Sequence, residues 1–379
     1  MKSNKRLLIV TTVPLTLKSI LAGQPKYLSN TFNVELATSP GPEMEDVATL
    51  EGLPIHQIKM ERGISIIKDI KSLIKMIILL RSIKPDMVHS FTPKAGLITM
   101  LSSFLCRIPV RIHTFTGLIF PSKTGFQHKL LVLMDKLICA CATKIVPEGE
   151  GVKKDLRKFG ITKKTLKVIG KGNIAGVDTN FYDQGLVTGT KRQVLLKKQL
   201  NLPSDAFVFV FVGRFTEEKG IIELVNAFEK LPERAHLLLV GELDSRIPLP
   251  EHIQTTISQH RRIHDLGWKS DIRHALSLSN VLVLPSYREG FPNTPLQAGA
   301  MSLPSIVTDI NGCNEIITQG VNGWLVPKQD TEQLALIMLE SMHSNNLSLM
   351  GEDARKYIID NFERKKHWQK MQLFYLEQV

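Results

Sequence analysis

The sequence predicts an α/β protein of two doubly wound, Rossmann-like domains that face a central cleft. Three observations predict this fold class. The chain has 379 residues, more than one ordinary domain needs. Short apolar runs alternate with helix-length stretches in both halves. Hydrophobic residues make up 43%, enough for two packed cores. We expect one domain at 1–185, a second at 186–355, and a C-terminal helix, 356–379, that crosses back to the first domain.

Five apolar runs in the first half are expected to form buried parallel strands: RLLIVTT, FNVELAT, DMVHSF, VRIHTF and KIVPE. Helical patterns lie between them, at Ile64–Ile83 and Gln127–Cys141. In the first of these helices the apolar residues share one face. The basic residues lie elsewhere on it: Lys68, Lys71, Lys75, Arg81 and Lys84. The pattern fits a core-facing helix with a solvated basic face, or a helix that lies on a membrane surface.

The second half repeats the α/β pattern after a polar stretch at Gly185–Gln199, which we expect to be a linker. Six runs are expected to be strands: AFVFVFVGRF, HLLLVGE, RIHDLGW, NVLVLPS, LPSIVTD and GWLVP. Sheets of this kind bind ligands at the carboxyl ends of their strands. Candidate residues are therefore sought where each strand ends.

Charge is distributed unevenly along the chain. Residues 1–185 hold 27 Lys and Arg against 14 Asp and Glu, whereas the remainder holds 21 against 22. A basic half implies an anionic partner. Nucleic acid is disfavoured, because no recognition motif is present and few aromatic residues lie among the basic ones. An anionic membrane surface, at the inner face of the cytoplasmic membrane, is the remaining expectation.

Targeting and cysteine patterns point to the cytoplasm. Residues Lys2–Lys18 resemble a signal peptide, but no convincing cleavage site follows, so we expect a buried first strand there. The apolar stretch Gly96–Cys106 is too short to span a bilayer. The four cysteines form no CxxC pair, which favours reduced thiols and no metal site.

The segment VLVLPSYREGFPNTPLQAGAM, 281–301, has the pattern of an anion site. A strand ends near Pro285, and a helix is expected to begin at Thr294 with that threonine as N-cap. The helix start and the preceding turn would hold a phosphate, through Gly290, Phe291, Pro292, Asn293 and Thr294. Glu289 precedes this site and would accept bonds from sugar hydroxyls. Gln297 fits a capping box with Thr294, or a contact to ribose.

Two further strand ends in this half carry candidate ligand residues. In FVFVGRFTEEKGI, Gly213 ends a strand, and Arg214 and Lys219 flank the loop that follows. Their donors suit a diphosphate, although pairing with the adjacent glutamates explains them equally well. Trp268, in RIHDLGWKSDI, would stack on a nucleobase or pack in the core.

The first half offers candidate residues for a second substrate. His89 and His113 lie at or near the ends of successive strands, and Thr116 and Gly117 follow the second one. A single histidine on a strand is usually a core residue, but two at neighbouring ends favour a site. Lys94 is a candidate for an acceptor phosphate.

The ordered motifs PDMVHSFTPKAGL, HTFTGL, GKGNIAGVDTNFY, FVGRFTEEKGI, LVLPSYREGFPNTPLQAGAM and TDINGCNEII resemble the retaining GT-B glycosyltransferases of bacterial surface polysaccharide synthesis, glycosyltransferase family 4, group 1. The likeness covers essentially the whole chain. It implies that Arg214 and Lys219 contact the donor diphosphate. It also implies that Glu289 binds the donor sugar and that His113 lies at the reacting centre.

Two positions depart from that family's pattern. The second Glu of its paired-Glu signature is Gln297 here, and Thr116 stands where many members carry His. The family's reaction uses a nucleotide-sugar donor and needs no metal or other cofactor.

The resemblance implies transfer of a hexose or N-acetylhexosamine from a UDP-sugar to a saccharide on a polyprenyl diphosphate. A UDP-N-acetylglucosamine 2-epimerase, which shares the architecture and the nucleotide, is the alternative enzyme. A non-catalytic basic protein that binds sugars or nucleic acid is the alternative of a different class.

Overall fold

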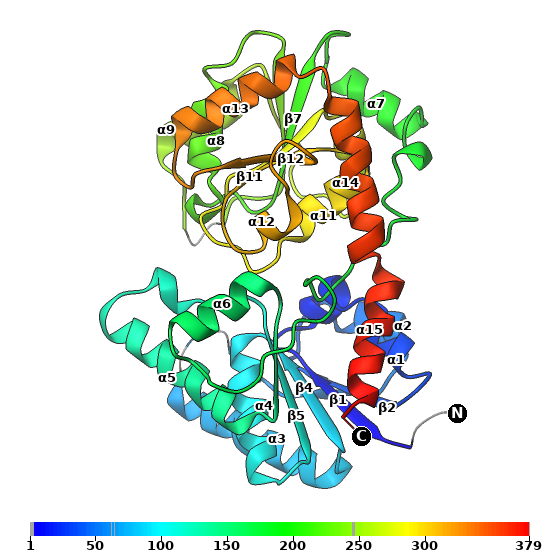
Figure 1. The fold of residues 1–379 in the computed structure, drawn as a ribbon, viewed down its shortest axis with the longest axis vertical. Helices are drawn as coiled ribbons and strands as arrows, with labels where there is room; N and C mark the ends of the chain where they lie inside the picture. Colours follow the sequence, from blue (N-terminus) through cyan, green and yellow to red (C-terminus); the bar gives the residue numbers. More distant parts are fainter. Residues whose placement is uncertain (1–3, 62, 64, 245–246, 379) are drawn as a thin grey trace. The chain divides into compact units, whose positions relative to one another are not determined.

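The computed structural model describes residues 4–61, 63, 65–244 and 247–378. The chain forms two compact units, unit 1 (1–176 and 365–379) and unit 2 (177–364) (Figure 1). Each unit contains a six-stranded parallel sheet with helices on both faces. The predicted α/β fold class with two doubly wound domains is thereby confirmed.

Unit 1 has the strand order β3-β2-β1-β4-β5-β6. Its strands are β1 (Arg6–Val10), β2 (Asn33–Thr38), β3 (Ile55–Gln57), β4 (Met87–Phe91), β5 (Val110–Phe115) and β6 (Lys144–Pro147). Its helices are α1 (Gln24–Leu28), α2 (Met44–Glu51), α3 (Ile66–Ile83), α4 (Pro93–Leu105), α5 (Gly125–Cys141), α6 (Glu150–Lys158) and α15 (Arg364–Leu376). Residue 64, where the helix Ile64–Ile83 was expected to begin, and Lys2 lie outside the described residues.

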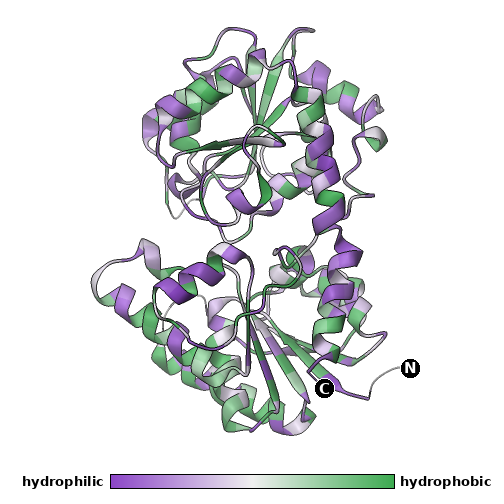
Figure 2. Ribbon diagram, viewed as in Figure 1, coloured by the Kyte–Doolittle hydropathy of each residue, from purple (hydrophilic) through white to green (hydrophobic). Residues whose placement is uncertain are grey.

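The sheet of unit 1 separates two cores, because alternate residues of each strand face opposite sides. Leu8 and Val10 face the core built with α3, α4, α5 and α6. Leu7 and Ile9 face the other core, which α1, α2 and α15 help to form. The strands are mainly hydrophobic along their length, as a sheet buried on both faces requires (Figure 2).

Unit 2 has the strand order β12-β11-β10-β7-β8-β9. Its strands are β7 (Phe207–Val212), β8 (Ala235–Val240), β9 (Ile263–Asp265), β10 (Val281–Leu284), β11 (Ser305–Thr308) and β12 (Gly323–Val326). Its helices are α7 (Lys191–Gln199), α8 (Ile221–Phe228), α9 (Glu251–Gln259), α10 (Arg273–Ser277), α11 (Asn293–Ala300), α12 (Cys313–Ile316), α13 (Thr331–His343) and α14 (Leu347–Phe362). Cores on both faces of this sheet cover it in the same way.

The boundary between the units falls at Gly176, before the expected boundary at Gly185. The backbone N–H of Val177 donates to Phe362 O at 2.8 Å, and Val177 O accepts from Arg364 N at 2.9 Å. These bonds tie the start of unit 2 to the end of α14. The C-terminal segment also divides there, since α14 packs in unit 2 whereas α15 packs in unit 1.

The polar stretch at Gly185–Gln199 is not a plain linker. It contains helix α7, whose N-cap Thr190 accepts a hydrogen bond from Gln193 N. Gln193 anchors the helix by donating to Ser277 O at 3.1 Å. Within the described residues, no helix has both the length and the apolar character that crossing a membrane requires.

Candidate functional site

The strand order of unit 2 reverses between β7 and β10, which defines where a ligand is expected. From β7 the chain moves outward through β8 to β9, and then returns to place β10 on the other side of β7. The loops after β7 and β10 therefore flank the reversal point at the carboxyl edge of the sheet. Residues 213–220 and 285–292, which hold most of the site residues predicted in unit 2, are these two loops.

Lys219 and Glu289 meet across the two loops. Lys219 Nζ lies 2.5 Å from Glu289 Oε1, and the two side chains are only 24% and 11% exposed. Partial removal from water strengthens their attraction. A cation and a carboxylate are thus held together beside the reversal point, where one can meet an anion and the other a hydroxyl group.

Close backbone contact keeps these loops together. Tyr287 N donates to Glu218 O at 2.9 Å. Gly220 adopts a φ of +69°, and a Cβ atom there would lie 2.0 Å from Pro285 O. Only glycine permits both the left-handed conformation and this approach. The pairing of Lys219 with Glu289 therefore depends on Gly220.

Arg214 extends from the end of β7 into solvent. Its side chain is 61% exposed, and its Nη1 donates to Asp244 Oδ2 at 3.0 Å. Asp244 is buried and follows β8, and the sequence analysis did not single it out. One carboxylate engages part of the guanidinium, whose planar fork has five N–H donors. Arg214 is thus oriented and can still bind an anion.

Helix α11 begins at Asn293, with Pro292 at the N-cap and no side chain that caps it. The expected start at Thr294 with a threonine cap is wrong. Thr294 Oγ1 instead donates to Val212 O at 3.5 Å, a long contact to the end of β7. A helix start without a side-chain cap presents backbone N–H groups to an anion.

Gln297 does not form the capping box, because Thr294 is not the N-cap. In the part of the chain that the structure describes, its side chain makes no hydrogen bond, and it is half-buried one turn into α11. A contact from Gln297 to a ligand is the interpretation that remains.

Gly290 and Phe291 are packed against the loop after β11. A Cβ on Gly312, whose φ is +77°, would lie 2.3 Å from Gly290 O and 2.9 Å from Phe291 Cα. Glu289 lies close enough to Cys313 that its charge, after burial, helps to raise the pKa of that thiol. Loops from β7, β8, β10 and β11 thus converge on one edge.

Trp268 follows β9 and is 64% exposed. The alternative that it packs in the core is therefore wrong. Gly267 O accepts a hydrogen bond from Gly241 N at 3.1 Å, which holds the preceding residue near the end of β8. The indole ring keeps a face free for stacking.

The two histidines predicted as site residues, His89 and His113, are buried on opposite faces of the sheet of unit 1. His89 Nδ1 bonds to Tyr375 Oη at 2.5 Å, and its Nε2 to Thr114 Oγ1 at 2.7 Å. Burial lowers the pKa of His89 well below its usual value. With both nitrogens engaged, His89 links β4, β5 and α15, and its contacts are those of a core residue.

His113 bonds through Nδ1 to Ser90 Oγ at 2.9 Å. Burial lowers its pKa to about 3, so the ring is neutral near pH 7. A Cβ on Gly96 of α4 would lie 2.3 Å from His113 Cε1, so the ring occupies space that only glycine leaves. A neutral imidazole is a hydrogen-bonding group rather than a cation.

Lys94 is buried on α4 and pairs with Asp69 of α3, with 2.7 Å between Nζ and Oδ2. Its charge is therefore already balanced within unit 1. Thr116 and Gly117 follow β5 and are half-buried, and Gly117 has a φ of +101°. These residues lie at the carboxyl edge of the sheet, as the sequence analysis expected, whereas Lys94 faces α3.

The strand order of unit 1 reverses between β1 and β4, and hydroxyl groups that the sequence analysis did not single out gather there. Thr12 Oγ1 lies 2.6 Å from Thr92 Oγ1 and accepts from Ala95 N at 3.1 Å. Thr92 adopts a φ of +78°, which is rare for a β-branched residue. The signal available was the pair Thr11–Thr12 directly after the first apolar run.

The predicted site residues thus form two groups. Arg214, Lys219 and Glu289 gather with the start of α11 in unit 2, whereas the histidines and Lys94 lie in unit 1. In the described residues, no cluster of three or more His, Cys, Asp and Glu side chains is arranged to hold a metal ion.

Comparison with known families assigns both halves of the chain. Residues 206–344 match the model of "Glycosyl transferases group 1", and residues 15–147 match that of "Glycosyl transferase 4-like". The two matches lie in unit 2 and unit 1 respectively.

Two named relatives cover most of the chain. The capsular polysaccharide biosynthesis glycosyltransferase CapM of Staphylococcus aureus is 29% identical over 378 residues, which is 98% of this chain and 97% of CapM. The UDP-Gal:alpha-D-GlcNAc-diphosphoundecaprenol alpha-1,3-galactosyltransferase of Escherichia coli is also 29% identical, over 84% of this chain and 82% of its own. The fold resembles that of Anabaena HepE, solved in complex with UDP, with a TM-score of 0.82, 17% identity and full coverage of both chains.

Proposed function

We propose that the chain moves a sugar from a UDP-sugar to a lipid-linked saccharide with retention of configuration. The chain belongs to the glycosyltransferases of group 1 and the 4-like type and has the GT-B fold. The pairing of Lys219 with Glu289 at the reversal point of unit 2 carries this proposal. The name of the Staphylococcus relative supports a role in capsular polysaccharide synthesis. The name of the Escherichia relative supports a UDP-sugar donor and an acceptor linked to diphosphoundecaprenol.

In this proposal unit 2 binds the donor. Arg214 and Lys219 neutralise the diphosphate, together with backbone N–H groups at the start of α11 and in the segment Gly290–Asn293. Glu289 accepts hydrogen bonds from the donor sugar. Gln297 contacts ribose, and Trp268 offers a stacking surface for the base.

Bond breaking between the sugar and the diphosphate leads the proposed reaction. The sugar then develops oxocarbenium character, as in glycoside hydrolysis, and negative charge grows on the leaving UDP. When the diphosphate draws Lys219 toward itself, Glu289 exchanges that partner for the sugar hydroxyls. Preorganised cations at the diphosphate stabilise the charge that develops in the transition state.

Unit 1 receives the acceptor in this proposal. The carboxyl edge of its sheet offers neutral and polar groups, among them Thr12, Thr92 and Thr116. His113 is neutral and buried, so it supplies no charge. It instead holds the carboxyl edge of the sheet of unit 1 in place or donates a hydrogen bond. A saccharide on a polyprenyl diphosphate, extended at the cytoplasmic face of the membrane, is the proposed acceptor.

Release of nucleotide from a panel of UDP-, GDP- and ADP-sugars tests the proposal. We expect slow hydrolysis of one UDP-sugar without an acceptor, and its loss in Arg214→Ala. Addition of diphosphoundecaprenyl-linked saccharides should then convert hydrolysis into transfer, with an α-linked product from an α-linked donor. Epimerised UDP-sugar without free UDP would instead identify the epimerase. Failure of every nucleotide sugar to bind would reject the proposed function.

A further inference from the structure

Helix α3 has a second apolar face that the fold leaves uncovered. Met76 and Leu80 point into the core of unit 1. On another side of the helix, spaced three or four residues apart, lie isoleucines that are each at least half exposed: Ile67, Ile70, Ile74 and Ile78. A surface helix needs one apolar face to pack on its domain. A contiguous second one on a protein surface marks a place of interaction.

One of these isoleucines, Ile70, also lines an apolar groove. Helix α4 lies between α3 and α5 and forms the floor of the groove with Leu97 and Leu101. The groove has a volume of about 260 Å³ and its lining includes Leu130, Met134 and Leu137 of α5. Among the described residues that line it, only Asp69 is charged, and this side chain is paired with Lys94. Figure 2 shows α4 and much of α3 and α5 as hydrophobic.

Side chains of α5 extend the apolar surface beyond the groove. Phe126 and Leu133 are both more than half exposed, and they lie on the same side of α5 as Leu130 and Leu137 by helical spacing. Lys129 and Lys136 lie beside this stripe. We call the surface formed by Ile67, Ile70, Ile74, Ile78, Phe126, Leu133 and the groove the α3–α5 surface.

A row of lysines runs along α3 beside the isoleucines. Lys68, Lys71 and Lys75 follow the same helical spacing, and a cavity of about 290 Å³ lies among them and Lys59. Glu61 pairs with Lys68 at 2.9 Å and with Lys59 at 4.0 Å. Among the described residues, Lys71 and Lys75 have no acidic partner. The cavity therefore has an excess of positive charge.

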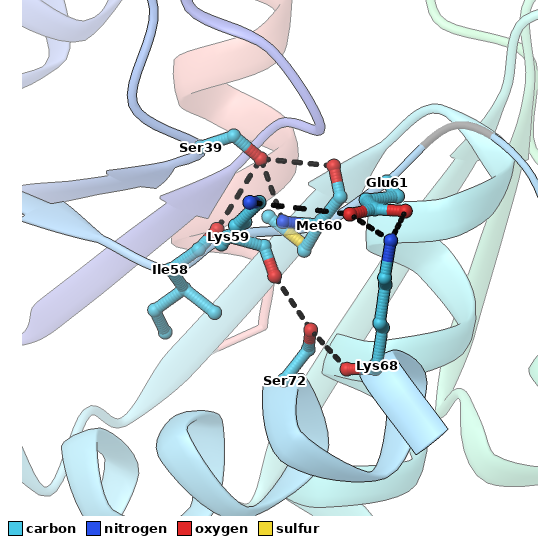
Figure 3. A network of polar contacts seen from close by, with 7 residues as sticks. All are labelled: Ser39, Ile58, Lys59, Met60, Glu61, Lys68 and Ser72. Carbon is cyan, nitrogen blue, oxygen red and sulfur yellow. Dashed lines mark hydrogen bonds and ion pairs between the residues drawn. The ribbon is translucent and has the colours of Figure 1, made fainter. Parts of the chain in front are cut away.

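The wall of this basic cavity is held in place by two serines. Ser72 Oγ lies 2.5 Å from Lys59 O and 2.8 Å from Lys68 O and shares its one proton between these carbonyl groups, which fastens α3 to the segment after β3 (Figure 3). Ser39 Oγ lies 2.8 Å from Met60 N, from which it accepts, and 3.0 Å from Met60 O. The lysines thus project from a fixed backbone.

We propose that the α3–α5 surface binds the surface of an anionic lipid bilayer. Apolar side chains with lysines beside them match the boundary between acyl chains and headgroups, where the apolar groups enter and the lysines meet phosphates. A second copy of the chain would present the same lysines, so the charges do not complement one another in that contact. The inference concerns binding to the bilayer itself and goes beyond the proposed transfer reaction.

The test is sedimentation of the purified full-length chain with vesicles. Phosphatidylcholine vesicles are compared with vesicles in which about a third of the lipid is phosphatidylglycerol. We expect binding to the anionic vesicles alone, and its weakening by salt. Lys71→Gln/Lys75→Gln should weaken binding about 25-fold, since each lysine near an anionic surface contributes about fivefold. Ile70→Ser/Ile74→Ser should also release the protein.

Helix α7 supplies a matched control. Val194 and Leu195 are exposed there beside Lys197 and Lys198, in unit 2. Val194→Ser/Leu195→Ser and Lys197→Gln/Lys198→Gln should bind as the unchanged chain does. Equal losses in the α7 and α3 variants would overturn the proposal, and so would a wild-type chain that ignores anionic vesicles. A change from dimer to monomer in the α3 variants, with vesicle binding unchanged, would identify a second copy as the occupant.

Hydrolysis of the UDP-sugar without vesicles separates this proposal from the proposed function. The α3 variants lie outside unit 2 and should keep that activity and their circular dichroism spectrum. Loss of vesicle binding in the α3 variants, with hydrolysis retained, supports the proposal that the α3–α5 surface binds the bilayer. Absence of both hydrolysis and nucleotide-sugar binding in every variant, including the wild type, contradicts the proposed function and leaves the vesicle result to be judged independently.

Discussion

Arg214 is the residue whose removal should affect turnover most directly. It is held by the buried carboxylate of Asp244 and is exposed at the end of β7, so it is oriented to meet the diphosphate that leaves in the proposed reaction. Arg214→Ala should cost about 3 kcal/mol of transition-state stabilisation, or about a hundredfold in kcat/KM for the UDP-sugar. Initial-rate measurement of UDP release gives this value directly.

Arg261→Ala is the matched control for that experiment. Arg261 is likewise exposed and paired with one carboxylate, that of Glu233. It should keep kcat/KM within about twofold, because exposed pairs contribute little. If Arg214→Ala also stays within about threefold, Arg214 does not serve the diphosphate.

Gln297 permits a test that separates binding from stability. Its side chain makes no hydrogen bond within the described residues, so Gln297→Ala should change the free energy of unfolding by at most about 0.5 kcal/mol. If the amide contacts ribose, the same change should weaken UDP binding by about 1 kcal/mol, or fivefold. Calorimetric titration with UDP measures this. Unchanged affinity would leave Gln297 without a donor contact.

Buried histidines make unit 1 sensitive to acid. Burial lowers the pKa of His113 to about 3 and of His367 to about 4, and that of His89 well below 6.5. Below pH 6.5 the unfolded chain therefore takes up protons that the folded unit does not take up. The free energy of unfolding of unit 1 consequently decreases as the pH is lowered. At pH 5 His113 and His367 each cost about 2 kcal/mol, and the lowered pKa of His89 adds to the loss.

Asp135 acts in the opposite direction. Burial raises the pKa of Asp135 to about 7. As the pH falls below 7, the folded unit therefore binds a proton that the unfolded chain does not bind until the pH is near 4. Between pH 7 and pH 5 this protonation of Asp135 stabilises the folded unit by about 2 kcal/mol, which offsets the destabilisation caused by one histidine. Hydrogen exchange in unit 1, corrected for its intrinsic pH dependence, should show a net loss of about 2 kcal/mol or more between pH 7 and pH 5. Asp135→Asn should make the loss steeper; an unchanged slope would show that Asp135 is charged in the folded unit.

At the scale of elements, Gly220 fixes the loop between β7 and α8 against the loop after β10. Gly220→Ala must relieve both a left-handed φ and a Cβ that lies 2.0 Å from Pro285 O. Gly160 is the matched control, since it has a φ of +61° with nothing within 4 Å of its Cβ position. Gly160→Ala should cost about 1 kcal/mol and Gly220→Ala about 3 kcal/mol or more, measured by thermal unfolding. Equal costs would mean that the loops separate without penalty.

Elements that are buried on both faces were predictable from the sequence. Strands such as β1 and β7 read as continuous apolar runs because no side of them faces water. Strand β3 escaped prediction, since its three residues at the sheet edge are half-buried or exposed. Helix α7 escaped because polar residues cover most of it, while Thr190 and Gln193 stabilise its first turn.

The candidate site was predictable in its residues but not in its pairings. Strand ends point to Arg214, Lys219 and Glu289, since parallel strands bring their carboxyl ends to one edge. The partner Asp244 lies after a different strand, so only the sheet order shows that it meets Arg214. The sequence likewise cannot show that His89 and His113 face opposite sides, with Tyr375 and Gly96 as neighbours.

At the scale of the molecule, each unit has its own cores, and the chain passes between the units at two places. The two crossings, at Val177 and Arg364, are hydrogen-bonded to each other. Separate cores joined by so few residues favour independent unfolding of the units. UDP should therefore protect unit 2, which holds the proposed donor residues, by about 2.7 kcal/mol at a concentration one hundred times its Kd.

Hydrogen exchange resolved to peptides measures both units in the same sample. Slower exchange in β7, β8 and β10 with unchanged exchange in β1, β4 and β5 is the expected result. Arg214→Ala, at the same UDP concentration, should lose part of the protection in unit 2 because its Kd is higher. Equal protection of both units would instead mean that UDP couples them. The acceptor could then bind more tightly to the donor-loaded enzyme, since coupling between two ligands is reciprocal.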